Sequence, residues 1–319
     1  MKILFTGASS FTGSWFVREL ARAGHEVVAT FRKRPGEYTD PVRRKRVAQA
    51  LEVCQGVTCS FGDTQFLELA RRGCDLLCHH AADVTDYKNP AFDAVAALQN
   101  NTRNIAAVVD ALCAGGGTKP KILVTGSVFE NDEGAGSGGL PAFSPYGLSK
   151  GLTWQIFRYY AGRAGLGLGK FVVPNPFGPY EEPRFTAYLM KTWFAGQTAA
   201  VSTPLYVRDN IHVSLLAGAY ARFAAELSKG SGTAFLRPSG YPESQGAFAA
   251  RFAAEMRRRL HLACELELKV QTDFSEPRVR INTDPVDGAA WGWHENEAWD
   301  AVAEYYEQML RPQKTAANR

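Results

Sequence analysis

The chain has 319 residues, of which 45% are hydrophobic and 21% charged, a composition typical of a soluble globular protein. This length exceeds what one small core usually covers, so we expect one large domain or one domain with an appended lobe. The formal net charge of +4 is compatible with an anionic small ligand and gives no reason to expect nucleic acid as a partner.

Short apolar segments alternate with helical patterns through the first half of the chain. Strands are expected at Lys2–Phe5, Glu26–Phe31, Val57–Phe61, Asp75–His79, Lys121–Thr125 and Lys170–Val173, and helices at Phe11–Ala23, Arg43–Val53, Thr64–Arg72, Phe92–Cys113 and Pro145–Ala164. Strands separated by helices pair in parallel through crossover connections. Because these strands are apolar without alternation, both faces of the sheet should be covered. The pattern predicts an α/β fold with a doubly wound parallel sheet.

The character of the sequence changes after Pro174. Ten of the sixteen prolines lie from Pro174 onward, and shorter helices are expected at Ala217–Leu227, Gln245–Leu260 and Asn296–Leu310. We therefore divide the chain into a sheet domain, 1–174, and a region, 175–319, that forms mainly a smaller lobe, with some segments returning to the sheet. Ligands of doubly wound sheets lie at the carboxyl ends of the strands, so this lobe should bind the substrate. The glycine-rich stretch Gly134–Gly139 is expected to be a mobile loop.

The first predicted strand leads into a glycine turn. Gly7 and Gly13 are the outer glycines of a G-x-x-G-x-x-G pattern, with Ser10 at the middle position. The backbone amides of Ser9, Ser10 and Phe11, at the start of the next helix, could bind the pyrophosphate of a dinucleotide. An ordinary strand–helix turn of small residues is the alternative. The position directly after the first strand favours a Rossmann-type dinucleotide-binding domain over residues 1–174.

A basic cluster follows the second predicted strand. The sequence there is Arg32-Lys33-Arg34, where an NAD site usually carries Asp or Glu for the ribose hydroxyls. A basic residue suits the additional 2′-phosphate of NADP, and Arg32 is the best placed of the three. We expect NADP, with NAD as the alternative cofactor; a solvated basic loop would also explain the cluster.

A Tyr-x-x-x-Lys pair begins the predicted helix Pro145–Ala164. The spacing of Tyr146 and Lys150 places both side chains on one helical face. The ammonium should lower the pKa of the phenol from its usual value near 10. Tyr146 could then exchange a proton with a substrate oxygen while hydride moves to or from nicotinamide, and Lys150 would hold the nicotinamide ribose.

The cysteines and histidines give no sign of a metal site. The six cysteines are irregularly spaced and form no C-x-x-C pair, which is typical of a reduced cytoplasmic protein with free thiols. Cys78, His79 and His80 are adjacent, but they end an apolar segment that is typical of a buried strand. No signal peptide is visible, and no apolar run approaches the roughly 20 residues that span a bilayer. We expect no metal and no membrane association.

Further motifs occur in a fixed order along the chain. They are Thr6–Gly13, Phe61-Gly-Asp63, His79-His-Ala-Ala82, Asn101, Thr125-Gly-Ser-Val-Phe129, Tyr146–Lys150, Asn175-Pro-Phe-Gly-Pro179 and Arg208-Asp-Asn-Ile-His-Val213. With these motifs the chain resembles the extended short-chain dehydrogenase/reductase family, also called the NAD-dependent epimerase/dehydratase family.

The resemblance implies a role for each matching residue at the cofactor. Asp63 would contact the adenine, and Ala81 and Ala82 would lie along the cofactor. Asn101 would support the site from the helix Phe92–Cys113.

The resemblance also implies substrate contacts and an assembly. Thr125, three residues before the valine of the family's motif, would bind the substrate oxygen, with Ser127 as the alternative. Asn175 would lie at the sugar nucleotide, and Arg208 would bind its diphosphate. The family often forms homodimers through the two long helices, so we expect a homodimer.

Several functions remain open. The leading hypothesis is an NADPH-dependent reductase of a keto-sugar nucleotide, acting through Thr125, Tyr146 and Lys150; the main alternative is a 4-epimerase that retains NAD(P). A carbonyl reductase for a small substrate and a non-catalytic NADP-binding protein are also considered. Gly126 stands where sugar-nucleotide dehydratases carry an Asp-Glu pair, which disfavours dehydration.

Overall fold

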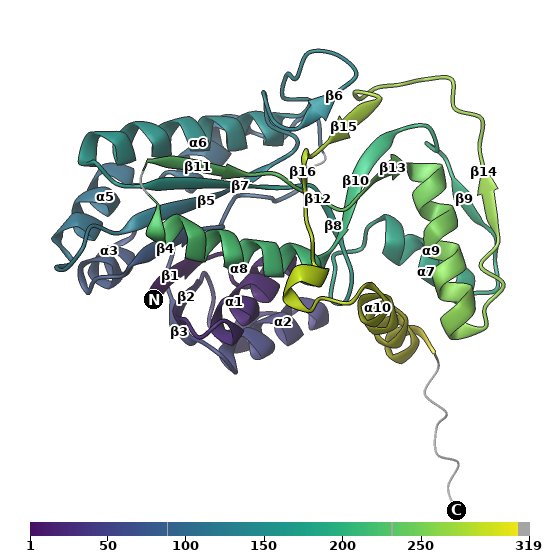
Figure 1. Ribbon diagram of the computed structural model, residues 1–319, viewed down its shortest axis with the longest axis horizontal. Helices are drawn as coiled ribbons and strands as arrows, with labels where there is room; N and C mark the ends of the chain where they lie inside the picture. The colour runs from purple at the N-terminus through teal and green to yellow at the C-terminus, as the bar shows by residue number, and fades with distance from the viewer. Residues whose placement is uncertain (88, 231, 312–319) are drawn as a thin grey trace, which may run out of the picture.

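The computed structural model describes residues 1–87, 89–230 and 232–311, which form a large sheet domain and a smaller lobe beside it (Figure 1). The large sheet has seven strands in the order β11-β7-β5-β4-β1-β2-β3, and every neighbouring pair is parallel. The strands are β1 (Lys2–Thr6), β2 (Glu26–Phe31), β3 (Gln55–Thr58), β4 (Leu76–His79), β5 (Lys121–Ser127), β7 (Leu168–Val173) and β11 (Thr233–Leu236). The predicted doubly wound α/β fold is confirmed.

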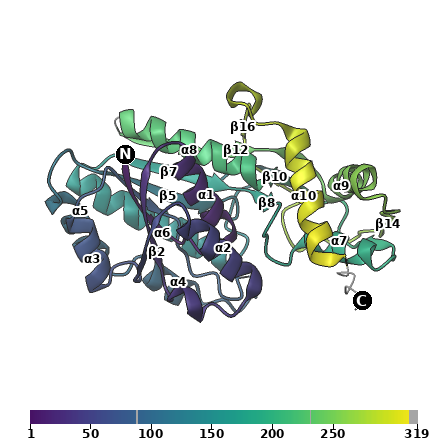
Figure 2. The same ribbon diagram turned by 90° about the horizontal axis from the view of Figure 1, so that it is seen from below.

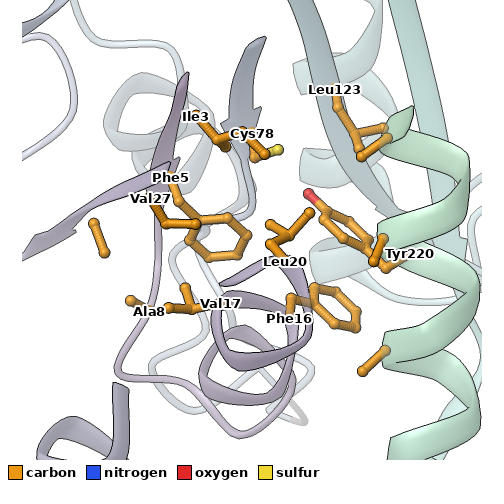
Figure 3. Packing of buried hydrophobic residues seen from close by; sticks show 14 of the residues in the cluster. Ile3, Phe5, Ala8, Phe16, Val17, Leu20, Val27, Cys78, Leu123 and Tyr220 are labelled. Atoms are coloured by element: carbon orange, nitrogen blue, oxygen red, sulfur yellow. The ribbon is translucent and has the colours of Figure 1, made fainter. Parts of the chain in front are cut away.

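Helices cover both faces of this sheet. One face carries α1 (Phe11–Arg22), α2 (Pro41–Leu51) and α8 (Val213–Lys229), and the other carries α3 (Thr64–Arg71), α4 (Ala94–Asn101), α5 (Ile105–Ala114) and α6 (Pro145–Ala164). On the first face, the rings of Phe16 on α1 and Tyr220 on α8 stack with centroids 4.0 Å apart. Figure 3 shows Tyr220 reaching from α8 toward the sheet between Cys78 and Leu123. Aromatic burial of this kind fixes α1 and α8 against the sheet.

The smaller lobe has its own sheet and its own core. Its strands run in the order β13-β10-β15-β6, and β8 pairs with β10. They are β6 (Ala135–Gly136), β8 (Asn175–Phe177), β10 (Val207–His212), β13 (Tyr241–Ser244) and β15 (Val279–Ile281), and two-stranded pairs join β9 (Ala199–Val201) to β14 (Leu266–Leu268) and β12 (Pro238–Ser239) to β16 (Asp284–Pro285). The helices α7 (Phe185–Phe194), α9 (Gln245–Leu260) and α10 (Glu295–Leu310) enclose buried Phe248, Phe252 and Trp299 (Figures 1 and 2).

The chain crosses between the two parts several times. Although α8 and β11 follow residue 175, they belong to the large sheet domain, where β11 pairs with β7. Conversely, β6 lies before residue 174 but pairs with β15 of the smaller lobe. These crossings hold the smaller lobe over the carboxyl ends of the large sheet, the edge where doubly wound folds bind ligands.

The structure corrects two predicted segments. The helix expected over Phe92–Cys113 is two helices, α4 and α5, separated at Asn104, whose φ of 52° is left-handed. The Asn104 side chain donates to the carbonyl of Gly62 at 2.8 Å, a contact distant in sequence that stabilises the break. The expected loop Gly134–Gly139 includes strand β6. Within the described part of the chain, no helix is long and apolar enough to cross a membrane.

Candidate active site

The glycine turn between β1 and α1 leaves no room for side chains at its two glycines. A Cβ on Gly7, whose φ is +84°, would lie 2.8 Å from the backbone nitrogen of Ala81, and one on Gly13 would lie 2.2 Å from the carbonyl oxygen of Gly7. Ser10 fits the middle position because its hydroxyl caps α1, accepting from the amide of Gly13 at 3.1 Å and donating to the carbonyl of Gly7 at 2.9 Å. The turn therefore has the close backbone packing that a pyrophosphate-binding turn requires, with Ser9, Ser10 and Phe11 at the helix N-terminus.

His80 joins this turn to the end of β5. Its Nε2 lies 3.1 Å from the hydroxyl oxygen of Ser10 and 3.0 Å from that of Thr12, and its Nδ1 lies 3.1 Å from that of Thr125. Burial, and secondarily the charge of Lys150, lowers the pKa of His80 to about 3, so the imidazole is neutral. Roles were predicted for Ala81 and Ala82 but not for His80. The signal that could have indicated His80 was the adjacent His79-His80 pair.

The loop after β4 is held at the same edge of the sheet. Asn101, on α4, accepts from the amide of Asp83 at 2.7 Å and donates to the hydroxyl of Thr153 at 3.4 Å, and so fixes the segment that carries Ala81 and Ala82. This geometry fits the supporting role expected of Asn101.

Two residues expected at the cofactor have different surroundings. Arg32 is exposed directly after β2. Against the effect of burial, hydrogen bonds from Thr85 and Asn100 lower the pKa of Asp83, and the charge of Arg32 adds to them. Asp63 caps α3: its two carboxylate oxygens accept from the amides of Ser60 at 2.7 Å and Phe66 at 2.8 Å. The cap explains Asp63 structurally, and contact with adenine would use the remaining lone pairs of the carboxylate.

Tyr146, in the first turn of α6, has aromatic neighbours. The ring centroids of Tyr87, Phe92 and Phe129 lie 5.2, 6.2 and 6.4 Å from its own. Burial, followed by the charge of Glu130, raises the pKa of Tyr146 above its usual value. The pKa of Tyr146 therefore lies above its usual value and not below it as predicted, because burial outweighs any nearby positive charge: Tyr146 is a phenol, ready to donate a proton.

Lys150 is buried one turn further along α6. Its ammonium donates to the carbonyl oxygen of Thr125 at 2.5 Å, which ties α6 to the end of β5. Burial lowers the pKa of Lys150 to about 8, while the carboxylate of Glu130 acts in the opposite direction.

The two hydroxyl candidates on β5 differ in their contacts. The side chain of Thr125 is 3% exposed and meets His80 on the face that α1 and α8 cover. Ser127 is 8% exposed at the end of the strand, where its hydroxyl accepts from the amide of Phe129 at 3.2 Å. Since Phe129 also packs against Tyr146, Ser127 belongs to the segment that adjoins the tyrosine.

The residues expected at the substrate lie on neighbouring strands of the smaller lobe. Asn175 of β8 pairs with Asn210 of β10, two residues from Arg208. The guanidinium of Arg208 is nearly buried and paired with Glu276 at 2.8 Å, and it also donates to the carbonyls of Val207, Pro277 and Arg278. Nη1 and Nη2 of Arg208 are thus both engaged, and a diphosphate that binds Nη2 would compete with Glu276.

Solved structures similar to this chain include three sugar-nucleotide epimerases. UDP-glucuronic acid 4-epimerase from Bacillus cereus, in complex with UDP-glucuronic acid and NAD, is 17% identical with a TM-score of 0.71, covering 97% of this chain and 100% of that one. UDP-glucose 4-epimerase from Thermus thermophilus, in complex with NAD, is 20% identical with a TM-score of 0.68, covering 96% and 99%. UDP-glucose 4-epimerase from Stenotrophomonas maltophila, with NAD and formylated UDP-arabinopyranose, is 19% identical with a TM-score of 0.72, covering 98% and 99%. At these identities the likeness shows the fold.

Sequence comparison identifies the family. No curated protein matches the chain in sequence. The family model described as the NAD dependent epimerase/dehydratase family matches residues 3–235, which include the glycine turn, Tyr146, Lys150 and Arg208. That match confirms the resemblance drawn from the ordered motifs, and the chain belongs to the NAD-dependent epimerase/dehydratase family.

Proposed function

We propose that this protein is a sugar-nucleotide 4-epimerase that retains its nicotinamide cofactor. The observation that carries this proposal is the Lys150 ammonium bound to the end of β5, with Tyr146 one turn before it on α6. Both residues lie at the sheet edge where the glycine turn presents the N-terminus of α1. Structural likeness to UDP-sugar 4-epimerases supports a sugar nucleotide as the substrate.

Four residues of this chain would have separate roles in such a reaction. A nicotinamide cofactor held at the glycine turn would supply the hydride acceptor and donor for the sugar carbon. Tyr146 takes the proton of the sugar hydroxyl as the hydride leaves, and gives a proton back to the carbonyl oxygen as the hydride returns. Lys150, one turn further along α6, contributes a positive charge that favours the phenolate needed for the first step, against the effect of burial. Ser127 binds the reacting oxygen, and Arg208 meets the diphosphate once Glu276 has moved aside.

Epimerisation can be tested with the whole protein and no reductant. UDP-glucose and UDP-glucuronic acid are each incubated with protein and NAD or NADP, and the sugars are resolved by anion-exchange chromatography. We expect conversion to the 4-epimer without net change in absorbance of the reduced cofactor. Tyr146→Phe should slow turnover by about 1000-fold because only the ionisable hydroxyl is lost, while cofactor affinity stays near wild type. Turnover by Tyr146→Phe within threefold of wild type would remove this residue from the mechanism.

NADPH-dependent reduction of a keto-sugar nucleotide is the second candidate. Two features favour it: the basic cluster Arg32-Lys33-Arg34, exposed after β2 without a carboxylate, and the raised pKa of Tyr146, which keeps a proton on the phenol. Reduction needs that proton first, because the carbonyl oxygen must be protonated as hydride arrives.

The cofactor and a keto substrate separate the two candidates. A 4-keto-6-deoxy sugar nucleotide with NADPH should lose the absorbance of the reduced cofactor stoichiometrically if the protein is a reductase. Arg32→Ala should then narrow the preference for NADP over NAD, since a contact to the 2′-phosphate is lost. Equal affinity of the wild type for both cofactors would sink the assignment of Arg32. Cofactor binding without turnover of any of these substrates would favour a non-catalytic NADP-binding protein.

A further inference from the structure

A buried cluster of charges lies behind the catalytic helix. Lys170 of β7 is 2% exposed, and its ammonium lies 2.6 Å from a carboxylate oxygen of Glu130 and 2.5 Å from one of Glu133. The other oxygen of Glu133 accepts from Arg237 at 2.7 Å. Glu130 is fully buried, and its second oxygen accepts from the amide of Ser127 at 2.7 Å. Even when paired, buried charged groups lose their hydration, so a gain in stability does not account for this cluster.

The Glu130–Lys170 pair is wedged between β5 and α6. A Cβ on Gly126 of β5 would lie 2.8 Å from Cε of Lys170 and 2.9 Å from a carboxylate oxygen of Glu130. A Cβ on Gly151 of α6, the residue after Lys150, would lie 3.8 Å from Cβ of Glu130. Gly126 thus leaves the space that the ion pair fills, and the stem of Glu130 is in ordinary van der Waals contact with α6 beside Lys150.

Glu130 and Glu133 act on different charged groups. Glu130 acts electrostatically on both Tyr146 and Lys150, raising the pKa of each. Glu133 faces Lys170 and Arg237.

Other charged and titratable groups also face the catalytic pair. Tyr87 and Arg184 face the phenol of Tyr146. Lys170, His79 and His80 face the ammonium of Lys150, and both imidazoles are neutral because burial lowers their pKa to about 3. Glu130 is therefore the carboxylate that offsets the positive charges around Lys150.

We propose that Glu130 is a positioning residue of the active site: its carboxylate, fixed by Lys170 and the amide of Ser127, is the counter-charge that keeps Lys150 cationic beside Tyr146. The same carboxylate holds the backbone of Ser127, so it also orients the hydroxyl proposed to bind the substrate oxygen. This role rests on the proposed use of Tyr146 and Lys150 in hydride transfer.

The matched pair Glu130→Gln and Glu133→Gln tests the proposal. Each variant removes one carboxylate from Lys170 and leaves the other, so a general loss of structure would affect both. The first readout needs no substrate: the titration of Lys150 is followed by NMR in protein with isotope-labelled lysine, and the Lys150→Arg variant identifies its signal. The second readout is the pH profile of turnover. Thermal unfolding establishes that each variant is folded, and Glu130→Met, which fills similar volume without a carboxylate, replaces Glu130→Gln if the latter does not fold.

The expected shift in the pKa of Lys150 differs in size between the two variants. In Glu130→Gln the pKa of Lys150 should fall by about one unit because an opposite charge is lost, and the pH profile should move to lower pH, since the pKa of Tyr146 falls as well. Glu133→Gln should leave the pKa of Lys150 and the pH profile of turnover near those of the wild type. An unchanged Lys150 titration in Glu130→Gln, or equal shifts in the two variants, overturns the proposal. A shifted Lys150 titration in a protein that turns over no sugar nucleotide would instead reject the proposed function and leave the role of Glu130 intact.

Discussion

At the scale of single residues, the hydrogen atoms around His80 can be assigned. The hydroxyl of Ser10 has one hydrogen, which it donates to Gly7, so Nε2 of His80 must be the donor toward Ser10. In a neutral imidazole, Nδ1 is then an acceptor, and the hydroxyl of Thr125 donates to it. The hydroxyl hydrogen of Thr125 is therefore used in a buried hydrogen bond and is not available to a substrate oxygen. This is the physical reason for proposing Ser127 as the hydroxyl that binds the substrate.

That assignment predicts unequal effects of two conservative substitutions. Ser127→Ala should lower kcat by about 100-fold, as when an active site loses a donor to a reacting oxygen. Thr125→Val, which keeps the shape of the side chain, should lower kcat by less than about tenfold, since only a hydrogen bond to His80 is lost. Initial rates at saturating substrate measure both. The reverse order of effects would restore Thr125 to the role that the resemblance implies.

At the scale of elements, prediction succeeded where local signals and burial agree. The bounds of α6 and α9 were predicted to the residue, because Pro145 opens the first and a Ser cap precedes each. The single helix over 92–113 was wrong because its break depends on the contact between Asn104 and Gly62, which no local pattern contains. Strand β6 and the Glu130–Lys170 pair were missed for the same reason: their partners lie far along the chain.

The segment between β14 and β15 carries the carboxylate that a bound nucleotide would have to displace. It brings Glu276 against Arg208, and the Glu276 side chain is 48% exposed. Arg208 is nearly buried, but the half-exposed Glu276 carboxylate can return to water, so a diphosphate should displace it. Glu276→Ala should tighten UDP binding by about fivefold, since the competitor for Arg208 is removed.

The matched control for that experiment is Glu267→Ala, which breaks the exposed Glu267–Lys269 pair of the same region without touching Arg208. Titration calorimetry with UDP measures both variants and the wild type. Unchanged UDP affinity in Glu276→Ala would place the diphosphate elsewhere than at Arg208.

At the scale of the whole molecule, buried ionisable groups determine how stability depends on pH. Burial lowers the pKa of His79, His80 and His212 to about 3, and raises those of Glu181 to about 7 and Asp209 to about 6. Between their folded and unfolded pKa values, the histidines bind more protons unfolded, so their contribution to stability is lost as the pH falls. The two carboxyls bind more protons folded, so their contribution is lost as the pH rises.

These opposing effects predict a steep loss of stability in acid. Below about pH 4 these two carboxyls become protonated in both states and no longer offset the histidines. Each then removes about 1.4 kcal/mol from the free energy of unfolding per pH unit. His212→Asn should make this dependence shallower by about that amount, because asparagine can still cap α8 but does not titrate. Urea unfolding at a series of pH values measures the slopes, and equal slopes in the two proteins would contradict the assignment.

The outer surface of the catalytic helix predicts the assembly of the molecule. Leu148, Leu152 and Tyr159 lie on the exposed side of α6 and are 44%, 40% and 58% exposed, and Val95 of α4, which packs beside α6, is 65% exposed. An apolar surface along two neighbouring helices is suited to pairing with its own copy about a two-fold axis. We expect a homodimer through α4 and α6, which would also hold in place the helix that carries Tyr146.

Leu152→Glu should yield monomers, because it would place two carboxylates close together at the surface where the two copies meet. Leu205→Glu changes a comparably exposed leucine of the smaller lobe, 55% exposed, and should remain dimeric. Light scattering at micromolar concentration distinguishes the two states, and a monomeric wild-type protein would refute this assembly.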